Sequence, residues 1–336
     1  MRRIALSSCA VPMLALAVLS VVAAAQAPES SAVKASANLP ERIWRNPGDI
    51  ASLDLRSGVG GKAHAPDPAG TFTFVEEDTG ATNPKFDVVD MRGVEWKVKL
   101  GQESQSETAA TRFLWAAGYF VDEDYFVAEL RVKGLPTLRR GQEFVSSGGI
   151  VHGARLERKR TAVEKIGDWD WFDNPFLGTR EMNGLRVMMA LINSWDLKKV
   201  NNAIYVVEGE RRYAVSDLGS SFGKSGRLGT QTKGVPKDYA ESKFIDKVTP
   251  DLVDLVLHNR PFFLSAVAIS NYRERTRMEQ ITKDIPRADA RWVGQRLSRL
   301  TVRQIRDGFR AAGYGAGDVD ILTEAIRLRI AALKAL

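Results

Sequence analysis

The chain has 336 residues, of which 44% are hydrophobic and 26% are charged. This composition excludes an intrinsically disordered chain, and the length suffices for one large two-lobed domain or for two small ones. The formal charge of +7 is modest and spread along the sequence, so we expect no nucleic-acid binding.

The N-terminus has the three parts of a secretory signal peptide. Arg2 and Arg3 come first, an apolar run follows over residues 11–22, and small residues stand at 23–25. We therefore expect a cleaved signal peptide over residues 1–25 and an exported protein, either periplasmic or extracellular.

Cleavage would remove the only cysteine, Cys9, and two arginines but no acid, so the charge would fall from +7 to +5. The mature chain would then have no disulfide and no stable membrane span. An uncleaved membrane anchor is the alternative, because residues 4–25 are long enough to cross a bilayer.

Residues 26–70 are predicted to form a tether and an N-terminal extension. Ala, Ser and Pro dominate residues 26–38, which cannot bury enough apolar surface to order themselves. Gly and Pro are frequent over residues 58–68, just before the first clear strand.

Strands are expected next. Residues 71–75 alternate between apolar and polar side chains, and residues 85–90 and 94–99 read as a hairpin that turns at Arg92 and Gly93. The sequence therefore predicts three antiparallel strands.

One helix and a fourth strand should follow. Ser104 and Glu107 have the spacing of a capping box, and Gly118 supplies a stop. Residues 125–130 read as a strand. The apolar face of the helix that precedes Gly118 would be formed by Ala110, Phe113, Leu114 and Ala117.

The second half of the sequence is predicted to be mainly helical. An apolar stripe at helical spacing ends just before Asp196, and it consists of Met182, Leu185, Met188, Met189 and Ile192. Beyond Lys247 we expect almost only helices. One covers residues 301–312 and stops at Gly313, and the last is capped by Asp318. Their inner faces would be formed by Ile305, Phe309, Ala312, Leu322, Ile326, Ile330 and Leu333.

Three polar residues flank a predicted hairpin in this region. Asn201 follows Asp196 by five residues, and Asp217 comes sixteen residues after Asn201, with strands expected over 203–207 and 213–215 between them. An Asp, an Asn and a second Asp in this order form a phosphoryl-transfer site, in which the first orients the attacking hydroxyl and the others hold magnesium.

With these motifs, residues 71–223 resemble an atypical member of the protein-kinase-like superfamily, closer to HipA-type toxin kinases and phosphatidylinositol kinases than to ordinary protein kinases. The resemblance implies a two-lobed α+β fold. A small antiparallel β lobe with one helix would span residues 71–150, and a mainly helical large lobe would span residues 151–336. It also implies ATP and Mg²⁺ as cofactors and an unidentified protein or small molecule as the phosphate acceptor.

The resemblance assigns roles to residues of the large lobe. Asp196 would orient or deprotonate the acceptor, and Lys198 would match the lysine two residues further on. Asn201 and Asp217 would bind magnesium, with Leu218 in place of the usual Phe after the Asp. Two departures from the family pattern are Ser194-Trp195 in place of His-Arg before Asp196 and the lack of an Ala-Pro-Glu motif.

The resemblance also assigns roles in the small lobe. Lys99 or Lys97 would be the strand lysine that contacts the phosphates, and Glu107 would be the helix glutamate that pairs with it. We prefer Lys99, which ends the strand. The phosphate loop would be residues 79–83, where Gly80 is the only glycine.

Two other functions compete. A secreted pseudokinase would keep the kinase-like fold as a scaffold that binds a ligand or a protein. A serine hydrolase would use Ser221, because residues 219–223 match the Gly-x-Ser-x-Gly pattern, with His258 as the only histidine that follows.

Overall fold

The computed structural model describes residues 38–80, 83–160, 163–224, 232–257 and 276–336. Several predictions concern residues outside this set: the signal peptide, nearly all of the tether, residues 81 and 82 of the phosphate loop, and His258. Among the helices that are described, none has both the length and the apolar character that crossing a bilayer requires.

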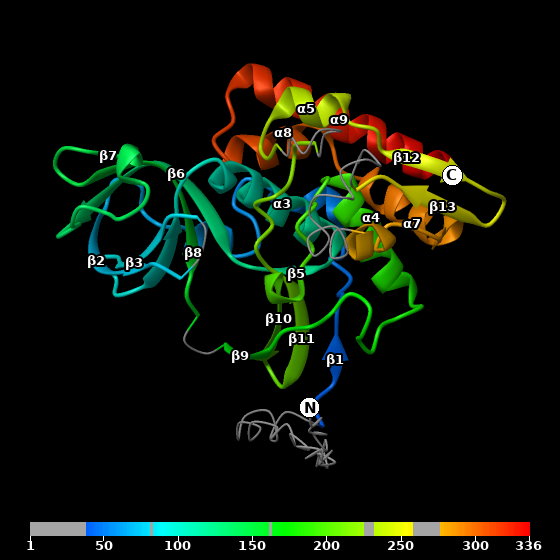
Figure 1. Cartoon of the computed structure of the whole chain (residues 1–336), viewed down its shortest axis with the longest axis horizontal. Helices are drawn as coiled ribbons and strands as arrows, with labels where there is room; N and C mark the ends of the chain where they lie inside the picture. The colour runs from blue at the N-terminus through cyan, green and yellow to red at the C-terminus, as the bar shows by residue number, and fades with distance from the viewer. Residues whose placement is uncertain (1–37, 81–82, 161–162, 225–231, 258–275) are drawn as a thin grey trace, which may run out of the picture.

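The small lobe is a β-sheet that closes on itself (Figure 1). The strands pair in the order β4-β3-β2-β6-β8, and β4 also pairs with β8. Only β2 and β6 are parallel, so the three antiparallel strands that the sequence predicts are confirmed as β2, β3 and β4. The bounds are β2 (Thr71–Asp78), β3 (Lys85–Val89), β4 (Glu95–Lys99), β6 (Asp124–Lys133) and β8 (Ile150–Arg158), with β7 (Val145–Ser146) paired to β8 and a short 3-10 helix η2 (Gln142–Phe144) before it.

Strand alternation separates the two faces of β4. Trp96 and Val98 are fully buried in the core of the small lobe, where Trp96 meets the ring of Tyr125 edge-on at 5.9 Å. Lys97 and Lys99 therefore point to the opposite face. That face turns toward the helix α3, which places the charged end of Lys99 outside the apolar core.

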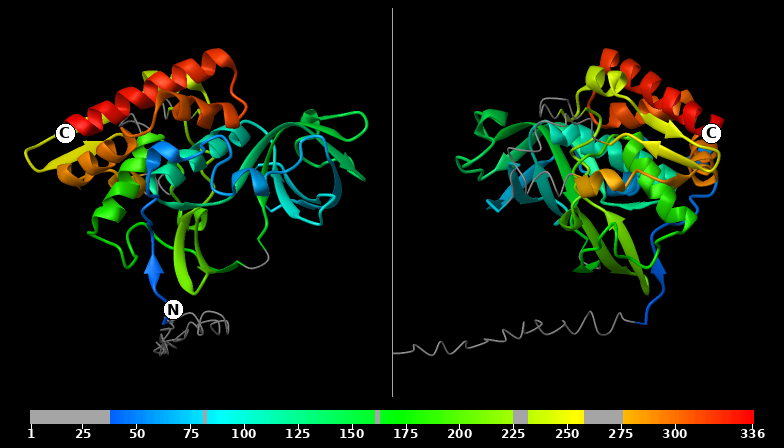
Figure 2. Two further views of the ribbon diagram at one scale, coloured as in Figure 1. Left: turned by 180° about the vertical axis from the view of Figure 1, so that it is seen from behind. Right: turned by 45° about the vertical axis from the view of Figure 1, so that its right-hand side comes forward.

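Helix α3 (Glu103–Ala117) lies between the small lobe and the helices of the large lobe (Figures 1 and 2). Its predicted apolar face is buried, and Phe113 packs against Phe222 and Phe309. The predicted stop is also confirmed, because Gly118 has a φ of 101°. A side chain there would be strained, and its Cβ would lie 2.4 Å from the carbonyl oxygen of Arg45.

The predicted capping box at the start of α3 is wrong. The N-cap residue is Gln102, and Ser104 lies inside the helix, where its hydroxyl donates to the carbonyl of Lys99 at 2.8 Å. Glu107 does not fold back on the helix backbone but turns to the ammonium of Lys99. A charge-assisted hydrogen bond to a buried lysine is stronger than the hydrogen bond to a backbone amide that a capping box would provide.

A second sheet is built around the predicted hairpin. Strands β10 (Asn202–Val207) and β11 (Glu210–Val215) are antiparallel, and the turn at Glu208 and Gly209 has positive φ at both residues, as a two-residue hairpin turn requires. The flanking strands come from distant parts of the chain: β9 (Glu164–Gly167) beside β10, and β1 (Glu41–Arg42) and β5 (Phe120–Val121) parallel to β11. Shorter helical turns are η1 (Ile50–Ser52), α2 (Gly61–His64) and η3 (Lys199–Asn201).

The large lobe packs its helices around the long C-terminal helix α9 (Figure 1). The predicted stripe before Asp196 is buried on α4, and the predicted inner faces of the last two helices are buried as well. The last helix begins after Gly315, so Asp318 stands in its first turn and is not its cap. The bounds are α4 (Arg180–Leu191), α5 (Pro236–Glu241), α7 (Arg287–Leu297), α8 (Val302–Ala311) and α9 (Ala316–Ala335).

The expectation of almost only helices beyond Lys247 is wrong. Strands β12 (Ile245–Val248), β13 (Leu252–Leu255) and β14 (Ile285–Pro286) form a three-stranded sheet. Pro250 stands in the connection between the first two strands, where it favours a turn over a continuing helix. These strands have only two to four residues, which is too short for a periodic pattern to be recognised. The predicted α+β class and two-lobed architecture are confirmed.

One buried arginine fixes the position of α4, the helix that leads to Asp196. Arg329 on α9 donates to the carbonyls of Ala190 and Leu191 at the end of α4, at 3.2 and 3.0 Å. It also donates to the carbonyl of Tyr239 at 3.0 Å and lies 4.0 Å from the centre of that ring. The carbonyl of Ala190 also accepts from the amide of Asn193, and that of Leu191 accepts from the hydroxyl of Tyr239. Arg329 is therefore a second, charged donor to both groups at the end of α4.

We predict that Arg329→Leu lowers the free energy of unfolding by about 3 kcal/mol, because buried carbonyls lose a charged donor. Urea denaturation would measure the change. The matched control is Arg327→Leu on the same helix. The Arg327 side chain is 48% exposed and pairs with Glu324, so the effect should stay below about 1 kcal/mol. Equal effects for the two variants would contradict this role of Arg329.

Candidate active site

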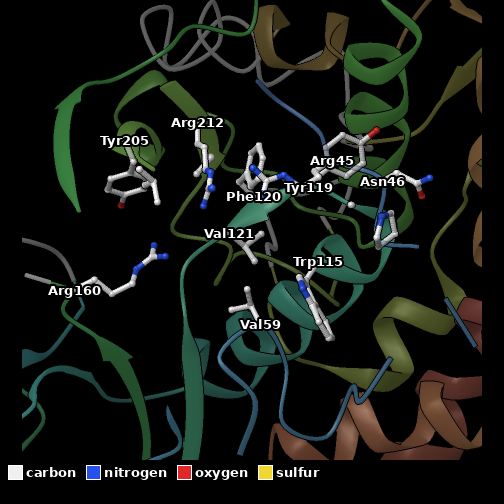
Figure 3. Close-up of a pocket in the computed structure, with 14 residues that line it drawn as sticks. Arg45, Asn46, Val59, Trp115, Tyr119, Phe120, Val121, Arg160, Tyr205 and Arg212 are labelled. Atoms are coloured by element: carbon white, nitrogen blue, oxygen red, sulfur yellow. The ribbon is translucent and has the colours of Figure 1, made fainter. Parts of the chain in front are cut away.

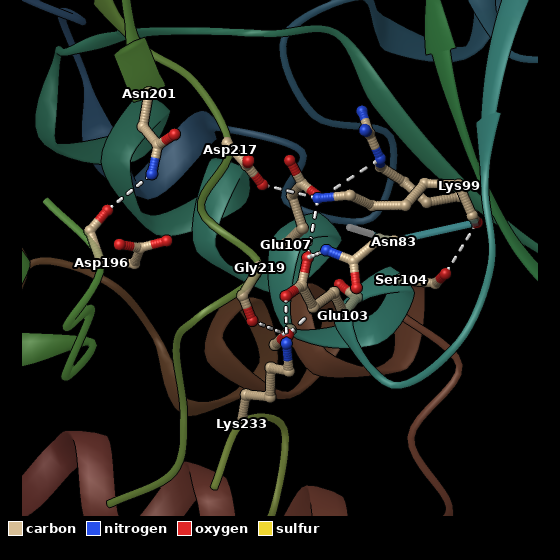
Figure 4. Close-up of polar contacts among 12 residues, drawn as sticks. Asn83, Lys99, Glu103, Ser104, Glu107, Asp196, Asn201, Asp217, Gly219 and Lys233 are labelled. Atoms are coloured by element: carbon tan, nitrogen blue, oxygen red, sulfur yellow. Dashed lines mark hydrogen bonds and ion pairs between the residues drawn. The ribbon is translucent and has the colours of Figure 1, made fainter. Parts of the chain in front are cut away.

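The ammonium of Lys99 lies at the centre of a cluster of carboxylates between the two lobes (Figure 4). Its Nζ is 2.7 Å from Oε2 of Glu107, 2.6 Å from Oδ1 of Asp217 and 2.9 Å from Oε2 of Glu103. The side chain of Lys99 is fully buried. We call these four residues the Lys99 cluster.

The local chain path explains why these groups meet. Strand β4 ends at Lys99, and Gly101, with a φ of 89°, lets the chain turn directly into α3. Glu103 and Glu107 are one helical turn apart, so both lie on the same side of α3. Asp217 follows β11 and has a φ of 47°, a left-handed conformation that Asp tolerates better than most residues.

The charges in the cluster stabilise one another. Burial by itself would lower the pKa of Lys99, but Glu107 and Asp217 outweigh it and raise the pKa above its ordinary value. Burial would raise the pKa of Asp217, but the ammonium of Lys99 outweighs it and holds the pKa below its usual range. The same balance lowers the pKa of Glu103. All three groups are therefore charged at neutral pH.

Three carboxylates in the cluster are close enough to hold a metal ion. Oxygens of Glu103, Glu107 and Asp217 lie within 4.8 Å of one another. In this structure the cation among them is the ammonium of Lys99. Further positive charge comes from Arg155, whose Nε is 3.4 Å from Glu107.

The loop that contains Asp196 runs beside the loop that contains Asp217. The amide of Trp195 donates to the carbonyl of Ser220 at 3.2 Å, and the amide of Ser216 donates to the carbonyl of Asn201 at 2.9 Å. These two hydrogen bonds join both ends of the segment 195–201 to the segment 216–220. Asp196 and Asp217 therefore lie on the same side of the molecule.

Within that loop the side chains are arranged by short contacts. Asn201 donates through Nδ2 to the backbone carbonyl of Asp196 at 2.7 Å, and the ammonium of Lys198 lies 2.9 Å from Oδ1 of Asp196. The side chains of Asp196 and Asp217 are 26% and 38% exposed. Both are accessible to a ligand.

The structure separates the two candidate strand lysines. Lys97 lies outside the cluster, where it is 34% exposed and its nearest carboxylate partner in the described chain is Asp78 at 3.8 Å. Gly80 is exposed, and its amide donates to Oδ1 of Asp78 at 3.0 Å. Of these residues, only Lys99 meets Glu107.

Sequence reasoning missed several members of the site. Glu103 stands four residues before Glu107, so helical spacing alone could have revealed it. Asn83, at the end of the predicted phosphate loop, donates to Oε2 of Glu103 at 2.6 Å, and Lys233 pairs with the other oxygen of Glu103. No local pattern marks Asn83 or Lys233, because their contacts join segments 20 and 130 residues from Glu103.

The hydrolase reading of Ser221 receives no support. Its side chain is fully buried, and its hydroxyl has no hydrogen-bond partner among the described residues. His64 contacts Glu123 and His152 contacts Ser146, so neither of the described histidines serves as a base for Ser221. A nucleophile needs both an accessible hydroxyl and a base.

We predict that Lys99→Met lowers the free energy of unfolding by about 3–5 kcal/mol, because it leaves buried carboxylates without their counter-charge. Urea denaturation would measure the change. Lys97→Met is the matched control on the same strand and should change stability by less than about 1 kcal/mol. A stable Lys99→Met protein would show that the carboxylates do not depend on this ammonium.

Comparisons with known proteins concern the fold only. No protein-family model matches the chain, and a search of curated proteins finds no match. Among solved structures, the chain is similar to the Helicobacter pylori proinflammatory kinase CtkA, with 13% identity, a TM-score of 0.43, and coverage of 79% of this chain and 94% of that chain. It is also similar to the Golgi casein kinase with Mn/ADP bound, with 9% identity, a TM-score of 0.40, and coverage of 79% and 71%.

Proposed function

We propose that the chain is an atypical kinase that transfers phosphate from Mg²⁺-ATP to an unidentified protein or small-molecule acceptor. The observation that carries this proposal is the buried ammonium of Lys99, which joins Glu107 of α3 to Asp217 of the loop after β11. Within the kinase-like superfamily, the motif pattern favours the HipA-type and phosphatidylinositol kinases.

A buried ion cluster of this kind is poor evidence for stability, because apolar side chains of similar volume would hold the lobes together as well. Strongly shifted pKa values that arise from burial and specific charge partners are typical of functional sites. Lys99 would contact the phosphates, and Glu107 would hold its ammonium in place. A phosphate oxygen can replace a carboxylate oxygen as the acceptor from Lys99.

Asp217 and Asn201 fit the role of metal ligands. Asp217 uses one carboxylate oxygen for Lys99, which leaves the other for a cation. Asn201 uses its side-chain nitrogen for Asp196, and in the described part of the chain its Oδ1 accepts no hydrogen bond. Carboxylate and amide oxygens are ligands that Mg²⁺ prefers. A divalent cation would neutralise the negative charge of the phosphates.

Asp196 fits the role of the group that orients the acceptor. Its carboxylate is partly exposed beside the Asp217 loop and accepts from Lys198. It would accept the hydrogen bond of an acceptor hydroxyl and take its proton during transfer. Lys198 would orient this carboxylate through the ion pair between them.

The second candidate is a pseudokinase scaffold that binds a ligand or a protein without phosphate transfer. Glu103 favours this reading, because its carboxylate lies 2.9 Å from Lys99 and competes there with a phosphate. The predicted phosphate loop also has a single glycine, Gly80, which limits close approach of the backbone to phosphate.

We predict that ATP with Mg²⁺, at about 100 times its dissociation constant, stabilises the protein comprising residues 26–336 by about 2.7 kcal/mol. Thermal denaturation would measure the stabilisation. The release of ADP over time would measure the rate of phosphate transfer. Asp217→Asn should weaken both, because a neutral amide is a poorer metal ligand. Asp196→Asn should abolish ADP release but leave the stabilisation, since Asp196 faces the acceptor.

The control for these measurements is Lys97→Met, which lies outside the Lys99 cluster and should behave as the unmodified protein. Stabilisation by ATP without ADP release, in the presence of varied protein acceptors, would favour the pseudokinase. No stabilisation by ATP with either Mg²⁺ or Mn²⁺ would contradict nucleotide binding.

We also propose that the protein is exported and acts in the periplasm or outside the cell, because its N-terminus has the pattern of a signal peptide. Expressed at full length in a Gram-negative host, it should be recovered outside the cytoplasm with Gln26 as its first residue, as N-terminal sequencing would measure. A membrane-bound form that keeps residues 1–25 would instead indicate an anchor.

A further inference from the structure

A pocket of about 200 Å³ lies where the N-terminal extension, the C-terminal end of α3, strand β5 and the β10–β11 hairpin meet (Figure 3). No residue that lines it belongs to the Lys99 cluster. The lining residues that matter for the argument are Arg45, Trp115, Phe120, Arg160, Tyr205 and Arg212. We call it the β5 pocket.

Positive charge exceeds negative charge around the β5 pocket. The carboxylate of Glu210 is shared by three arginines, Arg42 at 2.8 Å, Arg45 at 2.5 Å and Arg212 at 2.6 Å. Glu208 adds a second carboxylate, 2.5 Å from Arg212. Three arginines, Arg45, Arg160 and Arg212, line the pocket itself, and no acidic residue is among the described residues that line it.

Arg160 is the arginine best placed to bind an anion. In the part of the chain that the structure describes, no carboxylate lies within 4.0 Å of its guanidinium, and the guanidinium carbon lies 5.9 Å from the centre of the Tyr205 ring. The guanidinium ends of Arg160 and Arg212 converge on the same side of the pocket (Figure 3). An anion there could accept from both.

Aromatic rings hold these cations in place. The ring of Phe120 lies beneath Arg212 and Arg45, with distances of 5.3 and 5.9 Å from the guanidinium carbons to the ring centre. Tyr205, which faces Arg160, is itself fixed by a hydrogen bond from its hydroxyl to Oδ1 of Asp122 at 3.2 Å. Cation–π contacts orient guanidinium groups without neutralising them.

The opposite wall of the β5 pocket is apolar. It is formed by Val59, Val121 and the indole of Trp115 (Figure 3). A wall of this kind stabilises a flat apolar group by removing it from water. The volume is smaller than the roughly 300–1,000 Å³ of sites for drug-sized molecules, so a ligand that fills it is small.

We propose that the β5 pocket binds a small ligand in which an anionic group is attached to a flat apolar body, as in an aryl phosphate. The anion pairs with Arg160 and Arg212, and the ring packs against Val59, Val121 and Trp115. This proposal is independent of phosphate transfer, since it uses none of the residues assigned to that reaction.

Titration calorimetry with phenyl phosphate tests the proposal. Phenyl phosphate should bind at least about tenfold more tightly than inorganic phosphate, because the ring adds apolar burial. Arg160→Ala should weaken phenyl phosphate binding about tenfold or more, since a charge-assisted contact is lost, and Arg160→Lys should restore part of the affinity. Arg303→Ala is the control of equal charge, because Arg303 is 89% exposed and lies outside the pocket.

Val59→Trp gives a second, independent variant, because Val59 is 39% exposed and a larger side chain there should fill the pocket and abolish binding. Asp217→Asn should leave the affinity unchanged. The proposal would be overturned by equal binding of phenyl phosphate and inorganic phosphate, by unchanged binding in both Arg160→Ala and Val59→Trp, or by no binding at all. Displacement of phenyl phosphate by Mg²⁺-ATP would also overturn it, because the pocket would then belong to the nucleotide site.

Discussion

The ion pairs of one buried lysine connect the parts of this structure that are relevant to function. Lys99 ends a strand of the small lobe, Glu103 and Glu107 lie on the helix between the lobes, and Asp217 follows the hairpin of the large lobe. A buried ammonium without counter-charges is very unfavourable, so the fold is constrained to keep these three segments together. The closed sheet fixes the position of Lys99, and the contacts of Arg329 with the end of α4 fix the helix that leads into the Asp196 loop.

Helix α3 connects two chemically different sites. Its first turns carry the acids of the Lys99 cluster, and its last turn supplies Trp115 to the β5 pocket. Its 15 residues correspond to a length of about 22 Å. Because nearly the whole helix is buried against both lobes, it is held as a rigid body. The two sites therefore share one structural element while using none of the same side chains.

The wrong and missing predictions have separate causes. Glu107 was expected to have a second role in a capping box, but an ammonium brought near by the tertiary structure is a stronger partner than a local amide. The three short strands after Phe244 were missed because each has too few residues for periodicity to be recognised. Helical spacing from Glu107 could have predicted Glu103 as a member of the cluster. It could not have predicted Asn83 or Lys233, since nothing in their neighbouring residues indicates a contact with α3.

The sequence by itself determined the α+β class, the hairpin between Asn201 and Asp217, and the buried faces of α3 and α4. These features depend on alternation, helical spacing and turn residues, which are local properties of the chain. Only the tertiary structure decided that the small-lobe sheet closes through β4 and β8, that a third carboxylate joins the cluster, and that arginines from distant segments surround the β5 pocket. Long-range packing and charge balance produce such contacts, and neither leaves a pattern in neighbouring residues.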